Sequence, residues 1–149
     1  METITVIFTK RKWNPVSLLI RWAIPRSRLS LAESSHCLVK DGDYYIEANM
    51  LHKVRRSKAD VAMKGLTVVK TVYYQVPNAE VGLAYGRTQV GKKYDWGGAF
   101  GLLDPDRNWT AENSWFCYEL TAAILRAAGR DQFNELGHIT GTTLLALKP

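Results

Sequence analysis

The chain has few cysteines and no recognisable metal or nucleotide motif. Its 149 residues include two cysteines, too few for a disulfide framework; we assign Cys37 and Cys117 to unlike environments and expect both to be reduced. There is no CxxC pair, no HExxH motif and no carboxylate cluster, so a metal site is not expected. The Gly-rich run Trp96–Leu103 lacks the lysine and spacing of a phosphate-binding loop, which argues against nucleotide binding. We therefore expect neither a metal nor a cofactor.

Long apolar runs are also lacking. No run reaches the roughly 18 residues that a membrane-spanning helix requires. Met1–Ile4 contains no basic leader, and the apolar run Val16–Ile24 is interrupted by Arg21 without a small-residue cleavage site, so no signal peptide is expected. These absences predict a cytoplasmic protein. Hydrophobic residues make up 46% and charged residues 23% of the chain, which is ordinary for a globular protein. The length of 149 residues predicts a single domain over residues 1–149.

The net charge is +6, and many of the basic residues gather near the N-terminus. A basic cluster at Lys10–Lys12 is followed by Arg21, Arg26 and Arg28. Such a segment is either a solvated basic face or a surface that attracts an anionic partner, such as a phospholipid membrane or a nucleic acid. We retain an anionic membrane surface as a candidate partner, whereas nucleic acid is not expected.

Apolar patterning predicts a mixed order of strands and helices. Alternating or β-branched runs favour strands, and asparagine before a periodic run is typical of a helix start. The expected elements are a strand at Thr3–Thr9, a helix from Asn14 to Ile24, a polar surface excursion at Asn49–Lys64, a long buried strand at Leu66–Val76, a helix from Asn78 to Val90 and a final helix beginning at Thr140 or Thr142.

Cys117 stands at the beginning of the most clearly helical segment. Helical spacing from Tyr118 onward is shown by Leu120, Ala123, Ile124 and Ala127, with Gly129 as the stop signal. Cys117 therefore falls on or just inside a helix N-terminus. Unpaired backbone N–H groups and the positive end of the helix dipole stabilise an anion there, so we expect the nucleophilic thiolate to be more populated near neutral pH. The alternative is that Cys117 is a small buried residue that packs the helix start.

A predicted hairpin upstream supplies possible partners for this cysteine. Asp41-Gly42 is a dipeptide typical of a tight hairpin turn. If these two residues form the loop, His36 lies directly opposite Glu47 on one sheet face, with Cβ atoms roughly 4.5–5.5 Å apart. A carboxylate at that separation can orient an imidazole, although a histidine on a strand is by default structural. The other face has an apolar set suited to the core: Cys37, Val39, Tyr44 and Ile46.

A thiol, an imidazole base and an orienting carboxylate are the parts of a triad for acyl transfer, and Cys117, His36 and Glu47 can be named for these roles. Their order resembles the NlpC/P60-type cysteine hydrolases of the papain-like class, in the circularly permuted branch that includes the lecithin:retinol acyltransferase-like and YiiX-like proteins. The resemblance depends on Ser35-His36 with its strand, Ile46-Glu47-Ala48, and Gly91–Gly98 followed by Phe116–Leu120. Each motif is short, and the joint order from about Ile4 to Leu145 is what is specific.

This resemblance implies a permuted papain-like α+β fold, in which an antiparallel sheet packs against a helix with Cys117 at its N-terminus. It implies a cysteine-dependent hydrolase or acyltransferase acting on an amide or acyl-ester bond of a peptide or lipid substrate, such as cell-wall peptide. It also implies that Tyr94 donates to the oxyanion together with the Cys117 N–H, although Tyr94 could equally be a core residue. Two residues depart from the family pattern, namely Tyr118, where serine is common, and Cys37 beside the histidine.

Two alternatives compete with this assignment. In the unpermuted order the histidine follows the cysteine, and His138 is the only histidine after Cys117. We argue against it because only the eleven residues Ile139–Pro149 remain, too few for the additional strands. His52 lies in the polar excursion without a turn that would bring it opposite a carboxylate. The competing functional class is a non-enzymatic binding module whose basic N-terminal region binds nucleic acid or anionic lipid.

Overall fold

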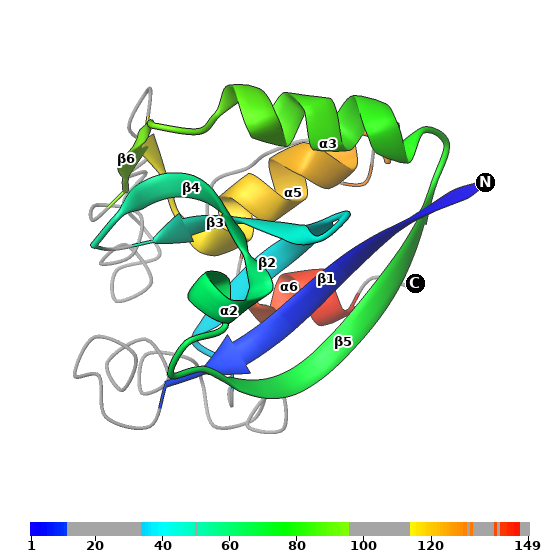
Figure 1. Ribbon diagram of the computed structural model, residues 1–149. Coiled ribbons are helices and arrows are strands. Elements are labelled where there is room, and N and C mark those ends of the chain that lie inside the picture. The colour runs from blue at the N-terminus through cyan, green and yellow to red at the C-terminus, as the bar shows by residue number, and fades with distance from the viewer. Residues whose placement is uncertain are drawn as a thin grey trace, which may run out of the picture.

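The computed structural model describes residues 1–11, 34–49, 51–95, 114–130, 132, 139 and 141–146. The expected helix from Asn14 to Ile24, the Gly-rich run Trp96–Leu103 and His138 lie outside the described residues. The described chain is a mixed α+β structure built on an antiparallel sheet of five strands in the order β4-β3-β2-β1-β5 (Figure 1). A separate parallel pair joins β6 to β7.

Among the described elements, the five strands of the main sheet precede the two longest helices in the chain. The strands are β1 (Glu2–Lys10), β2 (His36–Asp41), β3 (Tyr44–Asn49), β4 (Lys53–Lys58), β5 (Thr67–Val76), β6 (Lys93–Tyr94) and β7 (Ser114–Trp115). The helices are α2 (Ala59–Ala62), α3 (Ala79–Thr88), α5 (Cys117–Ala127) and α6 (Gly141–Ala146). The predicted first strand, the helix after Asn78, the helix at Cys117 and the final helix are therefore confirmed to within a few residues.

The core lies between one face of the sheet and helix α5. Ile4, Val6 and Phe8 alternate along β1 toward this face and are buried, and α5 contributes the buried Leu120 and Ile124. Each such side chain stabilises the fold by about 1.5–3 kcal/mol relative to exposure. Because α5 also packs on β2 and β3, its first residue is held against the strands that contain the predicted histidine and carboxylate.

The prediction that Leu66–Val76 is buried throughout is wrong. In β5, Val68 is 48% and Tyr73 58% exposed, whereas Tyr74 and Val76 are fully buried. β5 is an edge strand of an antiparallel sheet, and such a strand packs one face on the core and leaves the other in water. Its β-branched and aromatic composition favours a strand but does not decide how many of its faces are covered.

The hairpin between β2 and β3 forms, but with a register different from the predicted one. Asp41 pairs with Tyr44, so the loop residues are Gly42 and Asp43 rather than Asp41 and Gly42. Gly42 has a φ of 62°, a conformation that glycine adopts without steric cost at the first loop position of a type II′ turn. Asp41 stays in the ladder because its buried carboxylate binds Arg56 at 2.6 Å and Arg87 at 2.6 Å.

The expected surface excursion Asn49–Lys64 is also corrected. This segment contains strand β4, which pairs with β3, and the short helix α2. Val54 is the buried residue of β4, and most of its other residues are basic or polar. Edge strands commonly have such charged residues, since they discourage pairing with another sheet. Because β4 has so few apolar residues, its sequence does not show the apolar alternation that predicts a strand.

Helices α3 and α5 lie side by side in Figure 1 and approach closely at two glycines of α3. Asn78 caps α3 by accepting a hydrogen bond from the Val81 N–H at 3.1 Å. A Cβ atom at Gly82 would lie 2.6 Å from the Ile124 carbonyl oxygen and 2.7 Å from the Ala128 Cβ. The absence of a side chain at Gly82 is therefore what allows α3 to approach the helix that begins with Cys117.

Replacing Gly82 with alanine is expected to destabilise the fold. Alanine raises helix propensity by about 1 kcal/mol. Overpacking against a backbone carbonyl costs about 1–3 kcal/mol, however, and it should dominate. Urea unfolding should show a lower free energy of unfolding, whereas Val81→Ala, at the neighbouring half-exposed position, should stay within about 0.5 kcal/mol of wild type. Equal stability of Gly82→Ala and wild type would contradict the close helix contact.

Candidate active site

His36 and Glu47 are in direct contact. The His36 Nε2 and Glu47 Oε2 atoms are 2.6 Å apart. The predicted direct opposition is wrong, because the observed register, with Val39 opposite Ile46, continues to put Leu38 opposite Glu47. The register differs from the predicted one by two residues, so the side chains keep their faces and His36 reaches Glu47 diagonally. The contact that was predicted from the hairpin is thus present with a different backbone pairing.

Glu47 has a second cationic partner that sequence analysis missed. Arg55 stands directly opposite Glu47 in β4, and its Nε donates to Glu47 Oε1 at 2.6 Å. Glu47 is only 1% exposed, so its charge depends on these two contacts. Burial would raise the pKa of Glu47, but hydrogen bonding and attraction from His36 and Arg55 lower it below its ordinary value. The only sequence signal for Arg55 was Val54 among basic residues, a pattern of edge strands.

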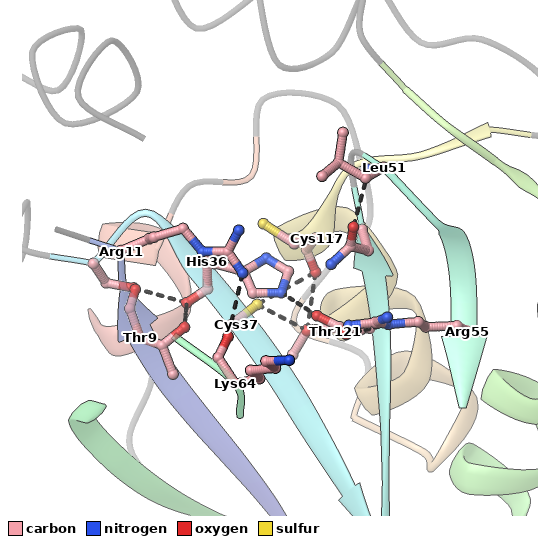
Figure 2. Close-up of polar contacts among 12 residues, drawn as sticks. Thr9, Arg11, His36, Cys37, Leu51, Arg55, Lys64, Cys117 and Thr121 are labelled. Carbon is pink, nitrogen blue, oxygen red and sulfur yellow. Dashed lines mark hydrogen bonds and ion pairs between the residues drawn. The ribbon is translucent and has the colours of Figure 1, made fainter. Parts of the chain in front are cut away.

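The imidazole of His36 also interacts with Cys117. Burial alone would lower the pKa of His36, but hydrogen bonding to Cys117 and to Glu47, together with their negative charges, raises this pKa to about 9. Figure 2 shows the Cys117 sulfur beside the imidazole ring. Because Glu47 occupies Nε2, the nitrogen left for the thiol is Nδ1. The structure therefore brings together the three side chains that the sequence named separately.

Cys117 is the first residue of α5, as predicted, but its acidity differs from the prediction. Burial raises the pKa of the Cys117 thiol well above its ordinary value, a hydrogen bond with Cys37 raises it further, and His36 lowers it. A helix dipole contributes about 0.3–1 kcal/mol, less than the roughly 1.4 kcal/mol of one pKa unit. Full burial can shift a pKa by about 3–5 units. The predicted enrichment of thiolate near neutral pH is therefore wrong for the resting protein.

Cys37 is a neighbour of Cys117, which corrects the prediction of unlike environments. Both thiols are free and buried. The Cys37 thiol lies 3.3 Å from the Cys117 carbonyl oxygen and 3.1 Å from the Thr121 hydroxyl oxygen. It therefore packs on the first turn of α5 and contributes to the raised pKa of Cys117.

Tyr118, one of the two residues that depart from the pattern of the family named above, links helix α5 to the chain before His36. Its hydroxyl donates to the Ser34 carbonyl oxygen at 3.0 Å. The Ser34 hydroxyl in turn lies 3.2 Å from the Thr9 carbonyl oxygen and 3.0 Å from the His36 carbonyl oxygen. Tyr118 is fully buried, so its position fixes the start of β2 relative to α5.

Tyr94 lies near this group. It is buried in β6, and its ring meets Phe116 edge to face with centroids 6.2 Å apart. Burial raises the pKa of Tyr94 well above its ordinary value, and the negative charge of Cys117 raises it further, so the two groups are within electrostatic reach. The Tyr94 hydroxyl is therefore protonated at neutral pH and can donate a hydrogen bond. His52, the weaker rival histidine, is exposed in the turn before β4.

The comparisons with known proteins give no independent family assignment. No protein-family model, curated protein or solved structure matches the chain. Among the described residues, no three His, Cys, Asp or Glu side chains gather in a group able to hold a metal ion. No helix within the described ranges has the length and hydropathy needed to cross a membrane.

Proposed function

We propose that this protein is a cysteine-dependent hydrolase or acyltransferase that acts on an amide or acyl-ester bond. The supporting observation is the connected set of Cys117, His36 and Glu47, in which a 2.6 Å contact to a buried carboxylate orients the imidazole toward the thiol. Cys117 is the nucleophile, His36 the general base and then acid, and Glu47 the group that holds the imidazole. The substrate class we propose is a peptide or lipid.

In the first step the Cys117 sulfur attacks the carbonyl carbon while its proton passes to His36 Nδ1. The bond to the leaving amine or alcohol then breaks, and His36 returns the proton to that group, which leaves an acyl thioester on the cysteine. Water or a second acceptor then attacks the thioester. Because His36 and Cys117 titrate as a pair, the reactive form is the one that has lost a single proton.

The oxyanion that forms during attack needs hydrogen-bond donors. The N–H of Cys117 belongs to the first turn of α5, where backbone donors have no partner within the helix. We propose this N–H and the Tyr94 hydroxyl as the two donors. Tyr94 is supported by its burial and its electrostatic interaction with Cys117.

We further propose that the fold is the circularly permuted papain-like arrangement of the NlpC/P60-type hydrolases. Support comes from the chain order, in which the histidine strand β2 and the carboxylate strand β3 precede the nucleophile helix α5. The antiparallel sheet against α5 is the arrangement that the resemblance implies.

Formation of an acyl adduct on Cys117 tests this function. Intact mass should show one acyl group after incubation with an activated acyl ester or acyl peptide, and Cys117→Ala should abolish this adduct. The matched control is Cys37→Ser, which keeps Cys117 and should still be acylated. A lipid acyl mass would identify lipid chemistry and a peptide-derived mass amidase chemistry. No adduct with any donor would contradict the enzyme and favour the non-enzymatic binding module.

A further inference from the structure

A cavity of about 620 Å³ is lined in part by Arg55, the residue of the candidate active site that donates to Glu47. Its wall includes Arg11, which follows β1, Arg55 in β4 and Lys64, which precedes β5. Arg55 also donates to the buried Glu47, the partner of His36, so this residue joins the cavity to the triad. Figure 2 shows these three cations drawn around His36 from separate segments of the chain. We call this space the basic cavity.

The basic cavity has an excess of positive charge. No acidic side chain of the described residues lines it, and no described carboxylate pairs with Arg11 or Lys64. One guanidinium nitrogen of Arg11 donates to the Lys64 carbonyl oxygen at 3.3 Å, which brings the two cationic residues together. Glu47 is shared between His36 and Arg55 and leaves the other cations uncompensated. Arginine side chains bind planar oxyanions through paired donors, and a cationic hollow concentrates anions.

Apolar side chains lie in the same cavity. Leu51 is 74% and Val61 48% exposed, although both are large apolar residues, and both line the basic cavity. Two apolar residues beside three cations match a ligand that combines an anionic group with an apolar chain. A purely solvated basic face would not require the apolar pair.

We propose that the basic cavity binds the oxyanion of an anionic amphiphilic acyl donor, with its apolar chain on Leu51 and Val61. The oxyanion is a carboxylate or a phosphate, the two groups that Arg11 and Lys64 recognise by the same chemistry. This inference rests on the proposed function, because it assigns the cavity to the substrate of Cys117. It adds a binding site to the triad and narrows the substrate class.

Binding to the full chain with Cys117→Ala tests the cavity without any need for chemistry. Titration calorimetry at low ionic strength should show saturable binding of octanoate and of octyl phosphate, which separate a carboxylate from a phosphate ligand. Neutral octanamide should bind at least about tenfold more weakly, as should inorganic phosphate, which lacks the chain. Affinity for the anionic amphiphiles should fall as salt is added.

Substitutions distinguish binding in the basic cavity from attraction by the net positive charge of the protein. Arg11→Gln combined with Lys64→Gln should weaken octyl phosphate binding at least about tenfold. The control pair Lys70→Gln and Arg126→Gln removes the same charge at exposed positions outside the cavity and should change affinity less than about twofold. Lys64→Gln alone changes an exposed side chain and guards against misfolding of the double variant. It should give an intermediate loss.

Three results would overturn the proposal. Equal weakening in the cavity pair and the control pair would show attraction by net charge alone. Equal affinity for octanoate and octanamide would show that the cavity does not recognise an oxyanion. If neither octanoate nor octyl phosphate showed saturable binding, the cavity would not be a binding site for these ligands. If neutral donors still acylate Cys117 in the last case, the cavity assignment fails while the proposed function stands.

Discussion

Replacing His36 with alanine is expected to abolish acylation of Cys117 and turnover of any donor that forms the adduct. The Cys117 thiol is buried, and its pKa is raised by burial and by Cys37, so it needs a base in contact to take its proton. The His36 imidazole is the group that lowers this pKa. In enzymes that use a catalytic triad, loss of a triad member reduces kcat by several orders of magnitude, so we expect a loss of about 10³-fold or more here.

The other described histidine provides the control. His52 is exposed in the turn before β4 and lines the basic cavity, so His52→Ala should leave acylation of Cys117 by a neutral donor, which does not use that cavity, within a few-fold of wild type. Circular dichroism and urea unfolding should establish that each variant is folded before rates are compared. A folded and active His36→Ala variant would contradict both the base assignment and the choice of the permuted order over His138.

The secondary structure near the site could be predicted well where a local sequence pattern alone determines it. The helix at Cys117 has regular apolar spacing, and it begins at the expected residue. The hairpin turn was recognised from Asp41-Gly42, but a glycine can occupy either of the two loop positions. Asp41 stays in the ladder because Arg56 and Arg87 bind its carboxylate, and these partners are distant in the sequence.

Parts of the candidate site could not be predicted because they depend on tertiary contacts. Arg55 was assigned to a surface excursion, since a basic edge strand has too few apolar residues to show a period of two. The acidity of Cys117 was predicted from its helix position, yet its pKa is dominated by burial and by Cys37, which lies far away in the sequence on strand β2. The contact between His36 and Glu47 was predicted correctly although the register was wrong, because a shift of two residues keeps each side chain on the same face of the sheet.

Replacing Glu47 with glutamine is expected to move the pH dependence of the reaction to lower pH. Hydrogen bonding to Glu47 and its negative charge help raise the pKa of His36 to about 9. In wild type the fraction of molecules in which the pair of His36 and Cys117 has lost one proton should therefore increase up to about pH 9. Without the carboxylate charge the His36 pKa should fall by at least about one unit, toward 6.5. The maximal rate should decrease less than in His36→Ala, because glutamine keeps the packing and a possible hydrogen bond.

Two measurements check this shift. NMR titration of the His36 ring should give the lower pKa in Glu47→Gln, and the rising limb of the rate profile should move with it. A rate profile that keeps its wild-type position while the maximum falls would contradict the assigned role of Glu47, because it would show that the carboxylate does not set the proton affinity of the base.

The same linkage predicts opposite trends in stability on the two sides of neutrality. The folded pKa of His36 lies above its ordinary 6.5, so its stabilising contribution is complete below about pH 6.5 and is lost as pH rises through about 9. The folded pKa of Glu47 is lowered from 4.5, so its contribution is present above about pH 4.5 and is lost as pH falls through the folded pKa. The free energy of unfolding, measured with urea, should therefore fall between about pH 6 and about pH 9 by more in wild type than in Glu47→Gln. That variant should be less stable than wild type near pH 6, because Arg55 and His36 then lose their buried counter-charge.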